Sequence, residues 1–254
     1  MRKPYLLRVP PMDPVSGGIR VVYGLYGWLL AKGQIAFLNT QIDVPSIGIY
    51  PEIYHGNDMG SQKVIRYILQ TPGRMGTSDE FGTFQRGPEA FDPKDEIYVF
   101  SKVYDQWNVP DDHILFLPII DLHTFRDQGK KRIKTAFYCA RGANLGKHPK
   151  DAIEITRQFA TDQQALADLL NECQTLYVYD HITAMLEIAR LCGCKIEYWG
   201  ETPLEVLKKY EPGMNGLGYK KEEKLYSDDF RKHYIDMVWL FKDRLDKFID
   251  HTQE

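Results

Sequence analysis

The chain of 254 residues lacks a long hydrophobic run and an excess of basic residues. No apolar stretch approaches the ~20 residues that cross a bilayer, and the apolar stretch at the N-terminus is too short for a signal peptide. The formal net charge of -3 disfavours a nucleic-acid binder, whose domain is usually basic. We therefore expect neither a membrane span nor a nucleic-acid partner.

Cysteine is also scarce, and its spacing shows neither a disulfide framework nor a zinc-ligand pattern. The expected state is a set of buried free thiols in a reducing cytoplasm, with metal binding or redox work as the alternative. The predicted localisation is cytoplasmic. The four cysteines are Cys139, Cys173, Cys192 and Cys194.

The remaining composition, 43% hydrophobic and 26% charged, is typical of a soluble globular protein. The length suits one large domain or two small ones. The polar segment 126–132 is the predicted boundary, although it could also be a basic surface turn inside one domain. The predicted domains are 1–126, 127–225 and a C-terminal helix at 226–254 that packs back on the first domain.

The first half opens with the pattern of a Rossmann-like domain: strand, glycine-containing loop, helix and strand. The loop lacks Gly-x-Gly-x-x-Gly, and no acidic residue follows the second strand at once, so a dinucleotide cofactor is disfavoured. An NAD-dependent oxidoreductase is nevertheless an alternative. The predicted elements of this half are strands at 5–9, 35–38, 47–53, 95–101 and 114–118, and helices at 19–31 and 61–69, the latter capped by Asp58.

The second half repeats the α/β pattern and ends in a long amphipathic helix. The apolar stripe of that helix predicts core or interface packing, and an oligomer is compatible with it. Its members are Phe230, Tyr234, Met237, Phe241, Leu245 and Phe248. The predicted elements are strands at 133–139, 176–179 and 195–199, helices at 149–159, 165–173, 184–192 and 202–207, a loop at 211–218, and a final helix from the cap Ser227 to 249.

Polar and basic side chains follow two predicted strands of this half. Arg141 and Lys147 lie in a glycine-bearing loop after one strand, and a polar turn containing Asp180, His181 and Thr183 follows the other. Open α/β sheets bind ligands at the carboxyl ends of their strands, and the free amides of a helix N-terminus favour a diphosphate there. Glu187, one helical turn further on, could accept from ribose hydroxyls. The alternative is a solvated loop.

Two further candidates lie in the first half. Glu52 and His55 come at the carboxyl end of a predicted strand, where either could take a proton from an acceptor hydroxyl. A hydrogen-bonded loop pair is the alternative. Gly17 and Gly18 precede the first helix, where small residues suit either a plain turn or a close backbone approach to a ligand.

Four stretches resemble glycosyltransferases of the GT-B fold, in particular bacterial polysaccharide and lipopolysaccharide enzymes. They are Ser-Gly-Gly-Ile-Arg at 16–20, Tyr-Pro-Glu through Pro-Gly at 50–73, Arg…Lys at 141–147, and the unit at 179–196. The resemblance implies two Rossmann-like domains facing across a cleft, with Gly17 and Gly18 near the sugar or phosphate. It also implies that Arg141 and Lys147 hold the donor diphosphate.

The predicted function is therefore transfer of a sugar from a nucleotide-diphosphate sugar to a glycan or lipid-linked acceptor, in polysaccharide biosynthesis. No Asp-x-Asp motif occurs, so we expect metal-independent transfer with no cofactor. Position 179, where the family pattern has a glutamate, is Tyr179 here. That departure motivates the alternative of a non-catalytic protein that binds sugar nucleotide or a partner.

Overall fold

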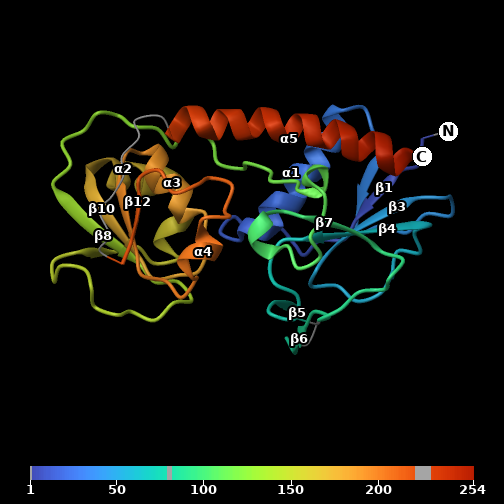
Figure 1. Ribbon diagram of the computed structural model, residues 1–254, viewed down its shortest axis with the longest axis horizontal. Helices are drawn as coiled ribbons and strands as arrows, with labels where there is room; N and C mark the ends of the chain where they lie inside the picture. The colour runs from blue at the N-terminus through green and yellow to red at the C-terminus, as the bar shows by residue number, and fades with distance from the viewer. Residues whose placement is uncertain (1, 79–81, 221–229) are drawn as a thin grey trace. The chain divides into compact units, whose positions relative to one another are not determined.

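The computed structural model describes residues 2–78, 82–220 and 230–254, and the chain divides into two compact units. Unit 1 contains residues 1–119 and 238–254, and unit 2 contains residues 120–237. Each unit has its own five-stranded parallel sheet (Figure 1). The predicted α/β class with two Rossmann-like domains is confirmed.

The sheet of unit 1 has the strand order β2-β1-β3-β4-β7. All four pairings are parallel, so the carboxyl ends of the five strands share one edge. A separate antiparallel hairpin is formed by β5 and β6. The strands are β1 (Tyr5–Leu7), β2 (Ala36–Leu38), β3 (Ile47–Pro51), β4 (Lys63–Ile68), β5 (Gly76–Ser78), β6 (Phe84–Arg86) and β7 (Glu96–Val99).

Alternate side chains of these strands enter different hydrophobic clusters, as the two-residue period of a strand requires. Tyr5 and Leu7 join the main core of unit 1, whereas Leu6 packs with Tyr50 and Met59 on the other face. The main core is covered by α1 (Gly17–Ala31) and by the last part of α5 (Phe230–Gln253). The opposite face of the sheet, where Leu6 lies, is covered by loop residues.

Helix α1 buries Val21, Val22, Leu25 and Leu29, a spacing of three and four that places them on one face. The helix ends where Gly33 adopts a φ of 70°, a left-handed conformation that glycine reaches without steric cost. Two short 3₁₀ helices complete unit 1, η1 (Lys102–Tyr104) and η2 (Asp111–His113).

The sheet of unit 2 has the order β12-β11-β10-β8-β9, again with every pairing parallel. Helix α2 packs on β10, and α3 packs on β10 and β11. The strands are β8 (Lys134–Tyr138), β9 (Ile153–Glu154), β10 (Cys173–Val178), β11 (Lys195–Tyr198) and β12 (Leu217–Tyr219). The helices are η3 (Phe159–Thr161), α2 (Gln163–Glu172), α3 (Met185–Leu191) and α4 (Leu204–Leu207).

Asp162 caps α2, because its carboxylate accepts a 2.9 Å hydrogen bond from the amide of Ala165. Asn171, near the other end of α2, is fully buried. Its side chain accepts from the amide of Gln128 and donates to the carbonyl of Arg126. The polar segment that begins at residue 126 is therefore fastened to a helix of unit 2.

The predicted apolar stripe of α5 is confirmed, since all six of its members are buried. Within unit 1, Phe248 stacks on Tyr5 and meets Tyr98 edge to face at a centroid distance of 4.9 Å. Within unit 2, the hydroxyl of Tyr234 accepts a hydrogen bond from the amide of Ile120. The predicted cap Ser227 lies outside the described residues.

Several predicted elements were wrong. The predicted helix at 61–69 is instead strand β4 (Lys63–Ile68), so Asp58 caps no helix there and pairs with Arg8 at 3.0 Å. Residues 149–159 contain β9 and the start of η3 instead of a helix. Residues 114–118 form only an isolated bridge through Ile114, and the predicted loop at 211–218 contains the start of β12.

The cysteines carry no disulfide: all four are free, three of them buried and Cys139 half-buried. This agrees with the predicted free thiols. Burial raises the pKa of Cys173 to about 11 and that of Cys192 to about 12, so neither thiol is ionised near neutral pH. Within the described part of the chain, no helix is both long and apolar enough to cross a membrane.

Candidate functional site

The strand order of the unit 2 sheet reverses between the neighbouring strands β8 and β10, which makes this a topological switch point. From β8 the chain moves outward to β9, and from β10 it moves the opposite way to β11 and β12. Such a reversal opens a crevice at the carboxyl ends of the two strands, where α/β sheets bind ligands. The segments that follow these strands, 139–152 and 179–184, contain most of the predicted donor-binding residues.

Tyr179 fastens these two segments together. Its hydroxyl oxygen accepts hydrogen bonds from the amides of Lys147 at 2.9 Å and His148 at 3.1 Å. A third contact joins the same oxygen to Nδ1 of His148 at 2.7 Å. Because both lone pairs of the hydroxyl are used by amides, its proton goes to Nδ1. Tyr179 is thus a structural anchor of the loop after β8.

Two glycines let the backbone segments approach closely. A Cβ atom on Gly142 would collide with the carbonyl group of Tyr179, and one on Gly200 would collide with the carbonyl of Asp180. The loop after β8 and the turn after β11 therefore both lie against residues 179–180. Larger side chains at 142 or 200 would push these segments apart.

Arg141, Asp180 and His181 are brought together. Asp180 is only 2% exposed, and its carboxylate accepts a 2.9 Å hydrogen bond from the amide of His181. Burial raises the pKa of Asp180, while the hydrogen bond from the amide of His181 and the nearby guanidinium of Arg141 oppose that rise. The carboxylate therefore holds the backbone of the two segments in place and lies close enough to Arg141 and His181 for their electrostatic effect to reach it.

Thr183 joins the same group through Tyr138, the last residue of β8. Burial raises the pKa of the Tyr138 hydroxyl, and so does the charge of Asp180; Arg157, Arg141 and a hydrogen bond with Thr183 act against it. Tyr138 and Arg157 are thus members of the group that the sequence did not reveal. Arg157 had been placed in a helix that does not form.

Lys147 is exposed, and its ammonium group lies 5.7 Å from the ring centroid of Trp199. That is within the range of a cation–π interaction. The indole N–H of Trp199 donates to Glu197 at 2.8 Å, which fixes the ring. His181 lies 3.9 Å from the exposed carboxylate of Glu201. The edge therefore carries the cation of Lys147 beside a flat aromatic side chain, with the imidazole of His181 on the neighbouring segment.

Glu187 belongs to a different group. Its side chain is buried, and its carboxylate accepts a short hydrogen bond from the hydroxyl of Tyr210. Arg190, also buried, donates to the carbonyls of Leu186, Pro212, Gly213 and Asn215 and lies over the ring of Phe230. Burial lowers the pKa of Arg190 to about 10, and Glu187 counters this effect. The predicted ribose contact of Glu187 stays a prediction.

Two of the predicted residues of unit 1, Glu52 and Gly18, lie against Leu69. The amide of Leu69 donates a 2.9 Å hydrogen bond to the carboxyl group of Glu52, and its side chain lies 3.6 Å from the position of a Cβ on Gly18. Gly17 begins α1 beside it and has open space around it. Burial raises the pKa of Glu52 to about 7, in the range of a general base or acid near neutral pH.

His55 is exposed and lies apart from the Glu52 contacts, with its Nε2 3.0 Å from the carbonyl oxygen of Arg86 in β6. An open pocket of about 460 Å³ also lies along α1. Its walls are Met12, Pro14, Arg20, Tyr23, Gly24, Trp28, Leu117, Pro118 and Ile119. None of the predicted site residues lines this pocket.

No protein-family model, curated protein or solved structure gives a significant match to this chain.

Proposed function

We propose that this chain is a glycosyltransferase that binds a nucleotide-diphosphate sugar at the carboxyl edge of the unit 2 sheet. The observation that supports it best is the grouping of Arg141, His181 and Thr183 at the reversal point between β8 and β10. Helix α3 has only seven residues, and the proposal does not depend on its N-terminal amides.

A leaving nucleoside diphosphate develops negative charge that fixed cations can stabilise. Arg141 offers the planar fork that matches phosphate oxygens, and Lys147 offers a mobile point charge from the same loop. Trp199, beside Lys147, presents an aromatic face suited to a base or sugar ring. These groups can neutralise the diphosphate without a metal ion.

Unit 1 would bind the acceptor, with Glu52 as the group that takes the proton from its hydroxyl. Its raised pKa supports that role, whereas its burial and its bond to the amide of Leu69 also suit a purely structural role. The acceptor is a glycan or a lipid-linked sugar. The proposed process is polysaccharide biosynthesis in the cytoplasm.

The alternative is a protein of related fold that binds a sugar nucleotide or a partner without transfer. Two observations favour it: Tyr179 serves as a loop anchor where the family pattern has a carboxylate, and the Glu187 carboxylate is occupied by Tyr210.

An assay of product release separates the two functions. The full chain is incubated with UDP-, GDP-, dTDP- and CMP-sugars, with and without glycan acceptors, and released nucleotide is measured. We expect acceptor-dependent release from one nucleotide class. Binding without release from any of them would support the non-catalytic alternative, and absence of both would refute the proposed donor site.

A further inference from the structure

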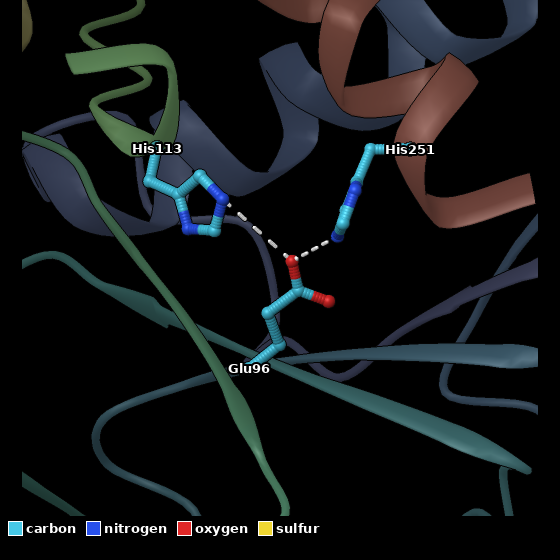
Figure 2. A group of neighbouring side chains, drawn as sticks. All are labelled: Glu96, His113 and His251. Atoms are coloured by element: carbon cyan, nitrogen blue, oxygen red, sulfur yellow. Dashed lines mark ion pairs between the residues drawn. The ribbon is translucent and has the colours of Figure 1, made fainter. Parts of the chain in front are cut away.

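Three metal-ligating side chains converge at the amino-terminal edge of the unit 1 sheet (Figure 2). Glu96 begins β7, His113 ends η2, and His251 lies in the last turn of α5. One ligand atom of each lies within 4.8 Å of the other two. All three residues belong to unit 1 and lie at the opposite sheet edge from Glu52.

His113 is held in a ligand-ready orientation. Its Nδ1 lies 2.9 Å from the carbonyl oxygen of Ile97, which can only accept, so the proton must be on Nδ1. Its ring also stacks on Tyr98 at a centroid distance of 4.1 Å and an interplanar angle of 7°. This contact directs Nε2 toward the carboxylate of Glu96, and in the neutral ring that nitrogen carries a lone pair. Metal-bound histidines are oriented by the same kind of backbone contact.

The two oxygens of Glu96 have different surroundings. Oε2 lies 3.1 Å from the ammonium group of Lys63, whereas Oε1 faces Nε2 of His113 at 3.8 Å and Nε2 of His251 at 2.6 Å. Oε1 is buried and accepts no hydrogen bond of normal geometry from the described residues. Two imidazole nitrogens thus surround one buried carboxylate oxygen, an arrangement that a bound metal cation would stabilise.

We propose that Glu96, His113 and His251 form a binding site for a divalent transition-metal ion, with Zn²⁺ as the best match. Two imidazole nitrogens and one carboxylate oxygen are a common zinc ligand set, which leaves a fourth position for water. Ligands ~2.1 Å from a tetrahedral ion lie ~3.4 Å apart. The His113 contact is close to that value, and the half-exposed ring of His251 needs to move outward by less than ~1 Å.

The bound ion would fasten the end of α5 to the sheet. Phe248 already packs against Tyr5 and Tyr98 one turn earlier, so the helix end is positioned before the ion binds. The site goes beyond the proposed glycosyl transfer, which does not require it. Its chemical role is structural, with one coordination position open to solvent.

The test uses the full chain after treatment with a chelator, titrated with Zn²⁺ by calorimetry and with Co²⁺ by visible absorption. We expect one ion per chain, nitrogen- and oxygen-ligated Co²⁺ bands without thiolate charge transfer, and a higher midpoint of thermal unfolding. His251→Ala and Glu96→Gln each reduce the affinity at least ~10-fold. The exposed His123→Ala is the matched control and keeps the wild-type affinity.

His251 is half exposed, so His251→Ala is expected to fold, and its far-ultraviolet circular dichroism provides the check. Absence of Zn²⁺ and Co²⁺ binding to the wild type would overturn the proposal, and so would equal affinity of wild type and His251→Ala. Thiolate bands would assign the ion to the cysteines instead.

Discussion

The hydroxyl oxygen of Tyr179 lies 2.7 Å from Nδ1 of His148 and accepts hydrogen bonds from the backbone amides of residues 147 and 148. One side chain at the end of β10 therefore sets the position of the loop after β8. That loop carries Arg141 and Lys147, the two cations that the proposed donor site requires. The geometry of the site depends on this anchor as much as on the cations.

Removal of the anchor tests this dependence. Tyr179→Phe keeps the ring but leaves two amides without their acceptor, which costs about 1–3 kcal/mol of unfolding free energy where the amides are buried. We expect nucleoside diphosphate to bind several-fold more weakly. Urea unfolding and calorimetric titration measure the two effects. Tyr177→Phe, within β10 itself, is the control. Equal affinity of Tyr179→Phe and wild type would contradict the anchoring role.

The buried carboxyl group of Glu52 predicts a pH dependence of stability. Its pKa rises from 4.5 to about 7 on folding, so the folded state retains the proton more strongly than the unfolded state. Its contribution is therefore most favourable below the unfolded pKa, and it is lost as the pH rises from about 4.5 to about 7. A shift of this size corresponds to a loss on the order of 3 kcal/mol.

Glu52→Gln removes that titration while keeping an oxygen that can accept from the amide of Leu69. We expect the wild type to lose more unfolding free energy than the variant between pH 5 and pH 8, measured by urea unfolding at each pH. Parallel pH profiles for the two proteins would show that Glu52 does not retain its proton in the folded state.

The interior pair of Glu187 and Tyr210 predicts a stability effect in unit 2. Tyr210→Phe leaves the buried carboxylate without its hydroxyl donor and beside Arg190, at a cost of about 1–3 kcal/mol. Thermal unfolding measures it, with the half-exposed Tyr219→Phe as the control. A Tyr210→Phe protein as stable as the wild type, binding nucleotide more weakly, would instead place this group in the donor site.

The sequence predicted the elements whose patterns are unambiguous. The stripe of α5 and the strands β8, β10 and β11 follow from period and length alone. Residues 63–68 were misread because Val64, Ile65, Tyr67 and Ile68 are apolar at helical spacing as well as in a continuous run. A central parallel strand is covered on both faces and gives such a run. Its β-branched and aromatic content is the signal that favours a strand.

The candidate site was predictable in part, because it depends on where the strands of unit 2 end. Strand ends could be located, and so the segments of Arg141, Asp180 and His181 were expected near one sheet edge. The partner of Glu187 lies at position 210, and the three ligands of the proposed metal site lie at 96, 113 and 251. Such pairings are set by tertiary packing, and no local pattern in the sequence reports them.

The most direct test of the account is calorimetric titration of the protein with UDP, GDP, dTDP and CMP. We predict that one of them binds to the wild type and that Arg141→Ala weakens this binding at least ~10-fold, since a charged hydrogen bond contributes about 1.5–3 kcal/mol. Lys150→Ala, an exposed cation on the same loop, should leave the affinity unchanged. Equal weakening by both variants, or no binding to the wild type, would contradict a donor site built around Arg141.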